Sequence, residues 1–288
     1  MLGSLTIHQP ATVAEAAKLR AELGDDGAIY AGGSELLLVM KEGIGRWRHL
    51  IDVKGIAALR ELRDAGGGLV IGATVTHRQL ERSPVLRARF PMLADMEAQV
   101  ANVRVRNVGT LGGNLCFAEP HSDPSTALLV YDARVVLAGP TAERTLPLAD
   151  FVTGSYETAL GADEVLARVD VPPPPARAVG AYLKFGYHER PTVGAAVLIV
   201  PAGDRVAEAR VSVGCIGPTP ARLGALEAGL AGMPLAALAA GIDARDGGFA
   251  GLDVVSDLHG SADYKREVAA VLVSRALADA AGRVRSAA

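Results

Sequence analysis

Two glycine-rich runs are the residues of this sequence best suited to contact a ligand. The first is Ala31-Gly32-Gly33-Ser34-Glu35, and the second is Thr110-Leu111-Gly112-Gly113-Asn114. Because glycine has no Cβ and adopts positive φ, paired glycines let successive backbone N–H groups point at one anion. Most glycine pairs are only tight turns. Two such runs, each after a strand-like segment, together predict a cradle for a diphosphate.

The neighbours of both runs favour anion binding. Residues 34–41 predict a short helix with Ser34 as its N-cap, which would bring a helix N-terminus to the first run. Asp123 followed by Pro124 predicts the N-cap and first residue of a helix that extends through Tyr131. Asp123 is thus explained equally well as a helix cap and as a ligand contact.

The two common nucleotide-binding templates are absent from the sequence. No G-x-x-x-x-G-K-[ST] run occurs, and Gly43-Ile44-Gly45 continues into Arg46-Trp47-Arg48 without reaching a third glycine. These patterns exclude a P-loop and a Rossmann fingerprint. A dinucleotide bound here would therefore need a different fold.

Cys116 and Cys215 are isolated from each other and from any Cys/His cluster. A conventional iron–sulfur cluster takes four cysteine thiolates, so such a centre would have to belong to another polypeptide. Isolated cysteines are most often small buried hydrophobic residues, which is the prediction for both. We expect no metal site in this chain.

Composition limits the classes of partner. The chain has 288 residues, half of them hydrophobic, with a net charge of −3 and 4% aromatic residues. Nucleic-acid binding needs a cationic surface and usually stacking platforms, so it is excluded. The N-terminus has no secretory signal pattern, and the longest apolar run, residues 193–200, is too short to span a bilayer. A cytoplasmic protein is expected, unless a partner carries it across a membrane.

Helix and strand patterns indicate an α+β chain of two domains. Thr12-Val13-Ala14-Glu15 is a capping box that opens a helix through Leu23, and residues 28–30 predict a strand that enters the first glycine run. Pro172-Pro173-Pro174-Pro175 can continue neither a helix nor an internal strand. The predicted domains are therefore residues 1–175, with subdomains of about 1–55 and 56–175, and residues 176–288.

The second domain shows two strand patterns and a long terminal helix. Residues 193–200 and 206–213 predict neighbouring strands joined around Gly203-Asp204. Helical spacing predicts that Tyr264, Val268, Val271 and Leu272 share one face of a terminal helix.

The second glycine run is part of a longer motif that resembles one of a known protein family. Arg106-Asn107-Val108-Gly109-Thr110-Leu111-Gly112-Gly113-Asn114, followed by Pro120, Asp123 and Ala127-Leu128-Leu129, resembles the flavin-binding motif of the molybdenum hydroxylase family. Together with Ala31-Gly32-Gly33-Ser34-Glu35-Leu36, it is similar to the FAD-binding medium subunit of the carbon monoxide, aldehyde and xanthine dehydrogenases of that family.

The resemblance extends over nearly the whole chain. Phe151, Gly154, Thr158 and Leu160 resemble the family's F-x-x-G-x-x-x-T-x-L segment, and Ser261-Ala262-Asp263-Tyr264-Lys265-Arg266 resembles the start of its last helix. It implies an FAD-binding domain of the vanillyl-alcohol oxidase, or p-cresol methylhydroxylase, type and a smaller C-terminal α+β domain.

The resemblance also implies a set of FAD-binding residues. Those that would wrap the pyrophosphate and ribityl chain are Ile29, Tyr30, Ala31, Gly32, Gly33, Ser34, Glu35, Leu36, Thr110, Leu111, Gly112, Gly113 and Asn114. Asp123 would hold the adenosine side, and Leu166 and Lys184 would approach the flavin, where the lysine charge would stabilise the anionic reduced form. A lysine is by default a surface residue, which is the competing interpretation of Lys184.

Other residues depart from the family's pattern or have only structural roles. Many relatives place an aromatic side chain against the isoalloxazine, whereas the counterparts here are Val100 and Arg190-Pro191, with Tyr187 as a substitute. His121 and His188 lack a placed partner, so we expect structural or solvated roles and no catalytic residue. Arg106 is expected to brace its loop.

The resemblance implies an electron-transfer subunit. Substrate would be oxidised at a molybdenum centre on a large partner, and 2Fe-2S clusters on a small partner would pass the electrons to FAD here and on to NAD or another acceptor. The complex would be a dimer of heterotrimers. The alternatives are a self-contained flavin oxidase or reductase of the same fold, with its own acid or base residue, and a non-enzymatic nucleotide-binding module.

Overall fold

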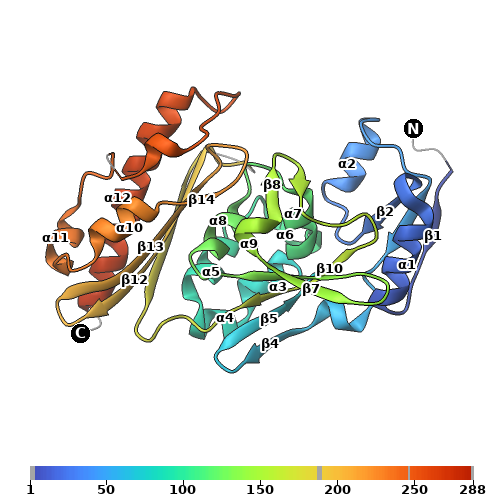
Figure 1. Cartoon of the computed structure of the whole chain (residues 1–288), viewed down its shortest axis with the longest axis horizontal. Coiled ribbons are helices and arrows are strands. Elements are labelled where there is room, and N and C mark those ends of the chain that lie inside the picture. The colour runs from blue at the N-terminus through green and yellow to red at the C-terminus, as the bar shows by residue number, and fades with distance from the viewer. Residues whose placement is uncertain (1–3, 187–189, 246, 287–288) are drawn as a thin grey trace.

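The computed structural model describes residues 4–186, 190–245 and 247–286. The chain forms three units that follow one another along the long axis of the molecule (Figure 1). The first is a parallel sheet in the order β1-β3-β2 with two helices. Its elements are β1 (Thr6–His8), α1 (Val13–Leu23), β2 (Gly27–Tyr30), α2 (Leu36–Lys41) and β3 (His49–Asp52).

The helix α1 and the strand β2 follow the sequence prediction. Thr12 is the N-cap of α1, and its Oγ1 accepts a hydrogen bond from the Glu15 backbone N–H at 3.1 Å. The carboxylate of Glu15 accepts from the Ala11 backbone N–H at 2.8 Å, one residue before the cap. β2 ends at Tyr30, so the chain enters the first glycine run directly from a strand.

The central unit is an antiparallel sheet in the order β4-β5-β10-β6-β7 with short helices. Its strands are β4 (Leu62–Ala65), β5 (Gly68–Gly72), β6 (Arg134–Ala138), β7 (Glu143–Pro147) and β10 (Val165–Val171), beside the hairpin of β8 (Val152–Gly154) and β9 (Glu157–Thr158). Its helices are α3 (His77–Arg82), α4 (Pro84–Arg89), α5 (Pro91–Glu97), α6 (Val103–Val108), α7 (Leu111–Phe117), α8 (Asp123–Leu129) and α9 (Leu148–Phe151).

The third unit is an antiparallel sheet in the order β11-β12-β13-β14, with helices on its outer side (Figure 1). Its elements are β11 (Val179–Phe185), β12 (Val193–Ala202), β13 (Arg205–Gly214), β14 (Ala221–Arg222), α10 (Gly224–Leu230), α11 (Leu235–Ala240) and α12 (Ala262–Ser286). β12 and β13 confirm the predicted strand pair, and Gly203 has the positive φ of +60° that their tight turn requires.

The four prolines connect β10 to β11, where the central sheet ends and the third begins. The two sheets are nevertheless joined by packing, because Tyr182, Ala196 and Leu198 belong to the apolar core of the central unit. The boundary between residues 175 and 176 stays a prediction.

Of the four residues predicted to share one face of α12, Leu272 is buried and Val268 partly buried in the core of the third unit. Tyr264 and Val271 are 46% and 40% exposed, whereas Ala269, Ala276 and Ala280 are fully buried against the third unit. The helix approaches the sheet through these small side chains, which contribute little to a hydrophobic pattern. Close approach of α12 therefore depends on the volume of its alanines.

We predict that Ala276→Leu lowers the free energy of unfolding by about 1–3 kcal/mol, because the added side chain has no space between α12 and the sheet. Val271→Leu adds volume on the exposed side of the same helix and should leave stability nearly unchanged. Urea unfolding of both variants measures the difference. Equal midpoints would contradict the tight packing of this face.

Candidate functional site

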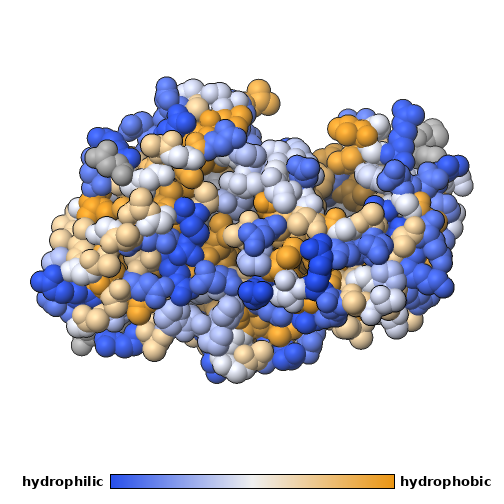
Figure 2. Space-filling model, in the orientation of Figure 1, coloured by the Kyte–Doolittle hydropathy of each residue, from blue (hydrophilic) through white to orange (hydrophobic). Residues whose placement is uncertain are grey.

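A cavity of about 1150 Å³ brings the two glycine runs together. In the space-filling view, the outline is hollowed between the lobe that carries α2 and the middle of the molecule (Figures 1 and 2). The volume slightly exceeds the usual range for ligand pockets, which suits an extended ligand. Of the predicted FAD-binding residues, those that line it are Ile29, Ala31, Gly32, Gly33, Ser34, Glu35, Leu36, Thr110, Gly112, Gly113, Asn114, Asp123 and Leu166.

Three predicted residues do not line this cavity. The ring of Tyr30 lies under the first glycine run, where a Cβ on Gly33 would be 2.5 Å from it, and the Lys54 ammonium lies 3.5 Å from its centroid. Leu111 is buried in the apolar core. Lys184 is partly buried and reaches the cavity wall only through Asp123.

The first glycine run has polar atoms without protein partners. Gly33 has φ of +77°, and Gly32 lets the run approach Val108, whose carbonyl oxygen would be 2.1 Å from a Cβ at that position. The backbone N–H groups of Gly32, Gly33 and Ser34 donate to no acceptor among the described residues. The buried Ser34 Oγ also lacks a hydrogen-bond partner there. Consecutive N–H groups in this conformation form an anion-binding concavity.

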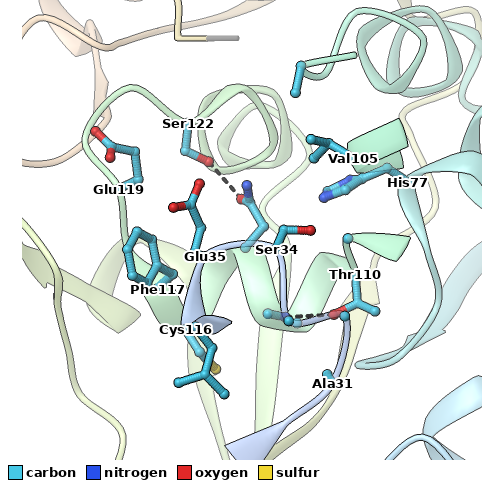
Figure 3. A pocket seen from close by; sticks show the side chains of 18 of the residues that line it. Ala31, Ser34, Glu35, His77, Val105, Thr110, Cys116, Phe117, Glu119 and Ser122 are labelled. Carbon is cyan, nitrogen blue, oxygen red and sulfur yellow. Dashed lines mark hydrogen bonds between the residues drawn. The ribbon is translucent and has the colours of Figure 1, made fainter. Parts of the chain in front are cut away.

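Ser34 does not cap α2, contrary to the sequence prediction. The helix begins at Leu36, Glu35 occupies the cap position, and no side-chain capping bond is present. The Ser34 hydroxyl instead lies at the cavity wall (Figure 3). This frees the hydroxyl for a ligand.

The second glycine run is the first turn of α7, not a turn after a strand, and helix α6 precedes it. Its N–H groups are already used: Leu111 donates to the Val75 carbonyl and Gly112 to the Ala73 carbonyl, both at 3.0 Å. Gly113 donates to the Thr110 Oγ1 at 3.1 Å. A Cβ on Gly112 would lie 2.6 Å from the Ala73 Cβ. These glycines therefore give close packing and leave space in the cavity, while the free N–H donors belong to the first run.

Asp123 joins the cavity wall to the third unit. It is the first residue of α8, not its N-cap, and α8 ends at Leu129, before the predicted Tyr131. Asp123 is 3% exposed. Its carboxylate accepts hydrogen bonds from Tyr182 OH at 2.5 Å and Lys184 Nζ at 2.9 Å. Burial raises the pKa of Asp123, and Lys184 and Tyr182 oppose this rise.

Lys184 also donates to the Gln99 carbonyl at 2.6 Å. Lys184 therefore lies behind Asp123, which lines the cavity, and contacts its carboxylate. The expected division, with Asp123 at the adenosine and Lys184 at the flavin, stays a prediction.

A polar chain crosses the cavity rim from the third unit. Lys265, which is fully buried, lies 2.5 Å from Asp257, and His121 lies 3.1 Å from Asp257 and 3.0 Å from Glu119. Burial would raise the pKa of Glu119, but the hydrogen bonds from His121 and Tyr156 and the charge of Arg190 outweigh it and lower the pKa to about 2. His121 therefore has placed partners that its isolated position in the sequence did not reveal.

A second pair escaped the sequence prediction. His77 and Glu97 are buried beside the cavity, with His77 Nδ1 2.8 Å from Glu97 Oε2. A lone histidine and a lone glutamate separated by twenty residues gave no signal of this contact.

The remaining predictions have mixed outcomes. Val100 and Arg190 line the cavity, while Tyr187 and His188 lie outside the described residues. Arg106 braces its loop, as expected, by donating to Glu81 at 3.0 Å and to the Val100 carbonyl at 2.9 Å.

Of the two cysteines, Cys215 is buried as predicted, whereas Cys116 is only half-buried and lines the cavity. Burial of its thiol raises the pKa of Cys116 to about 12, so the thiol stays protonated near neutral pH. Over the residues that the structure describes, no three potential metal ligands cluster. No helix in that part is long and apolar enough to cross a membrane.

Two family models match the chain. The model of the FAD-binding domain in molybdopterin dehydrogenase matches residues 3–174, and that of the carbon monoxide dehydrogenase flavoprotein C-terminal domain matches residues 187–280. Among curated proteins, the carbon monoxide dehydrogenase medium chain of Hydrogenophaga pseudoflava is 35% identical over 94% of both chains. The caffeine dehydrogenase subunit beta of Pseudomonas sp. (strain CBB1) is 31% identical over 96% of this chain and 94% of its own.

Solved structures agree with this assignment. A carbon monoxide dehydrogenase chain from Hydrogenophaga pseudoflava superposes with a TM-score of 0.91 at 35% identity, over 99% of both chains. A chain of quinoline 2-oxidoreductase from Pseudomonas putida 86 superposes with a TM-score of 0.91 at 27% identity, also over 99% of both. The expected α+β fold with a smaller C-terminal domain is confirmed. The chain therefore belongs to the family of FAD-binding medium subunits of the molybdenum hydroxylases.

Proposed function

We propose that this chain binds FAD in the cavity and carries electrons from 2Fe-2S clusters on a partner to NAD or another acceptor. The observation that carries the proposal is the first glycine run, where three consecutive N–H groups and the Ser34 hydroxyl have no acceptor or donor among the described residues. A diphosphate would satisfy all of them. When bound, FAD supplies the ability to accept electrons singly and to release them as a pair.

The residues of the chain would bind and orient the cofactor. Gly32, Gly33 and Ser34 would hold the diphosphate, and the glycines of α7 would leave room beside it. Apolar side chains such as Leu166 would exclude water from the cavity. Asp123 and Lys184, which contact each other, would form one polar contact region, with the lysine charge favouring an anionic ligand group.

The partners of the chain follow from the relatives. Two relatives are named as the medium chain of carbon monoxide dehydrogenase and as subunit beta of caffeine dehydrogenase, so each is one chain of several. We propose a large molybdenum-cofactor subunit and a small 2Fe-2S subunit as partners, assembled as a dimer of heterotrimers. A cytoplasmic location stays a prediction.

A self-contained flavin oxidase or reductase is the alternative. Such an enzyme would carry its own substrate pocket and acid or base residue, whereas relatives that match this chain over nearly its whole length are single subunits of larger dehydrogenases. The electron-transfer role is therefore favoured.

We predict that the purified chain binds FAD non-covalently, because its phosphate-facing groups are hydrogen-bond donors and the Cys116 thiol is protonated. Acid precipitation should release all flavin into the supernatant, where chromatography identifies it. FMN in the supernatant, or yellow colour in the pellet, would contradict the prediction.

Gly113→Val should abolish FAD retention in a folded chain. A Cβ at Gly113 would contact only Thr110 Oγ1, at 2.8 Å, so the valine side chain would occupy the cavity. The substitution should lower the free energy of unfolding by no more than about the contribution of the Thr110 helix cap. Gly229→Val is the matched control, because Gly229 lies in α10 with open space around it. Flavin fluorescence gives the affinity, and circular dichroism checks the fold. Gly33→Val is unsuitable, since its positive φ and the Tyr30 ring would strain the backbone.

The isolated subunit should be almost inert toward organic substrates. Stopped-flow absorbance would follow flavin reduction by aldehydes, purines or carbon monoxide, with and without the reconstituted partners. Reduction should appear only with the partners, because the electrons enter through another chain. Rapid bleaching by the chain alone would favour the self-contained flavoenzyme.

A further inference from the structure

His77 and Glu97 form a buried pair whose outer nitrogen faces the cavity. His77 begins α3, and Thr76 fixes that helix start through a capping box with Gln79. His77 and Glu97 are 1% and 2% exposed. His77 Nδ1 lies 2.8 Å from Glu97 Oε2, while Nε2 has no hydrogen-bond partner among the described residues. One side of the ring is thus anchored and the other is available.

The pairing determines what Nε2 can do. Glu97 has no other side-chain partner in the described chain, and a buried carboxylate charge is costly unless it is compensated. Glu97 occupies Nδ1, so Nε2 is the ring nitrogen left for a ligand. An acceptor-only ligand group pairs with Nε2 when that nitrogen carries the hydrogen, as it does in the imidazolium and in the neutral tautomer protonated there.

This nitrogen lies beside the unpartnered groups of the first glycine run. Figure 3 shows the His77 ring directed into the cavity next to Ser34. A Cβ on Gly109 would lie 3.3 Å from His77 Cδ2 and 3.4 Å from Ser34 Oγ. Both side chains therefore lie beside Gly109, which has no side chain of its own. Cδ2 is bonded to Nε2 in the ring. A single ligand group between them would contact both side chains.

We propose that His77, held by Glu97, is a diphosphate-binding residue that donates through Nε2 to a phosphate oxygen of the dinucleotide. The inference rests on the proposed function, since the ligand is FAD. It adds a side-chain donor from α3 to the N–H groups of the first glycine run. A phosphate oxygen is an acceptor only, which matches a wall built from N–H and O–H groups.

Two substitutions separate a role of His77 in ligand binding from a role in packing against Glu97. His77→Asn retains an amide donor at the position of Nδ1, facing Glu97, and removes Nε2. His77→Gln retains a donor near the position of Nε2 and gives up Nδ1. Because a hydrogen bond to a charged group is lost, His77→Asn should weaken FAD binding by about 10- to 100-fold. His77→Gln should retain most of the affinity.

The measurements are the dissociation constant of FAD, from flavin fluorescence of the full chain, and those of ADP and adenosine as competitors. ADP and adenosine differ only in the diphosphate, so His77→Asn should reduce the preference for ADP and leave adenosine binding unchanged. His49→Asn is the control, because His49 pairs with His8 on β1 and does not line the cavity. Thermal unfolding without ligand checks each fold.

Each outcome decides the proposal. Wild-type FAD affinity in a folded His77→Asn chain overturns it, as does an equal loss of ADP and adenosine binding. If His77→Asn does not fold, His77→Leu, which removes both ring nitrogens, decides: a loss of ADP binding with adenosine binding retained supports the proposal, and the wild-type preference for ADP overturns it. A wild-type chain that binds neither FAD nor ADP overturns the proposed function itself, whereas intact FAD binding that does not depend on His77 overturns only this inference.

Discussion

The site depends on the close contact of three backbone segments that are far apart in the sequence. Residues 31–34 lie against Val108 and Gly109, and the start of α7 lies against Ala73. These distances are possible only where no Cβ intervenes, so Gly32 and Gly112 fix how closely the first unit and α7 approach the central sheet. The floor of the cavity is accordingly made of backbone, and the side chains that could bind a ligand stand around it.

The unpartnered polar groups are concentrated on one side of that floor. The N–H groups of α7 are used within the protein, whereas those of Gly32 to Ser34 are not. The buried Ser34 Oγ is costly to the folded chain, because a buried polar group loses its water without gaining a partner. A ligand that supplies the acceptors would therefore stabilise the chain as it binds.

Local patterns in the sequence predicted the elements that form within a few residues, such as α1 with its Thr12 cap and the pair β12–β13. They failed where a distant contact decides the outcome. The sequence around Gly112 and Gly113 is typical of a turn, yet both residues lie in the first turn of α7, where each glycine costs about 1 kcal/mol. The reason is the close contact of Gly112 with Ala73, almost forty residues earlier in the sequence. The His77–Glu97 pair and the alanine face of α12 also arise only from tertiary packing.

The polar chain from Lys265 through Asp257 and His121 to Glu119 also has a kinetic meaning. It ties the third unit to the rim of the cavity by charged groups that are largely shielded from water, alongside the Asp123–Lys184 contact. The third unit thereby sets the positions of Glu119 and His121, which line the cavity. Local separation of the units would change this part of the wall, so the opening rate of an interface would contribute to the residence time of the ligand beside the contacts that the ligand makes.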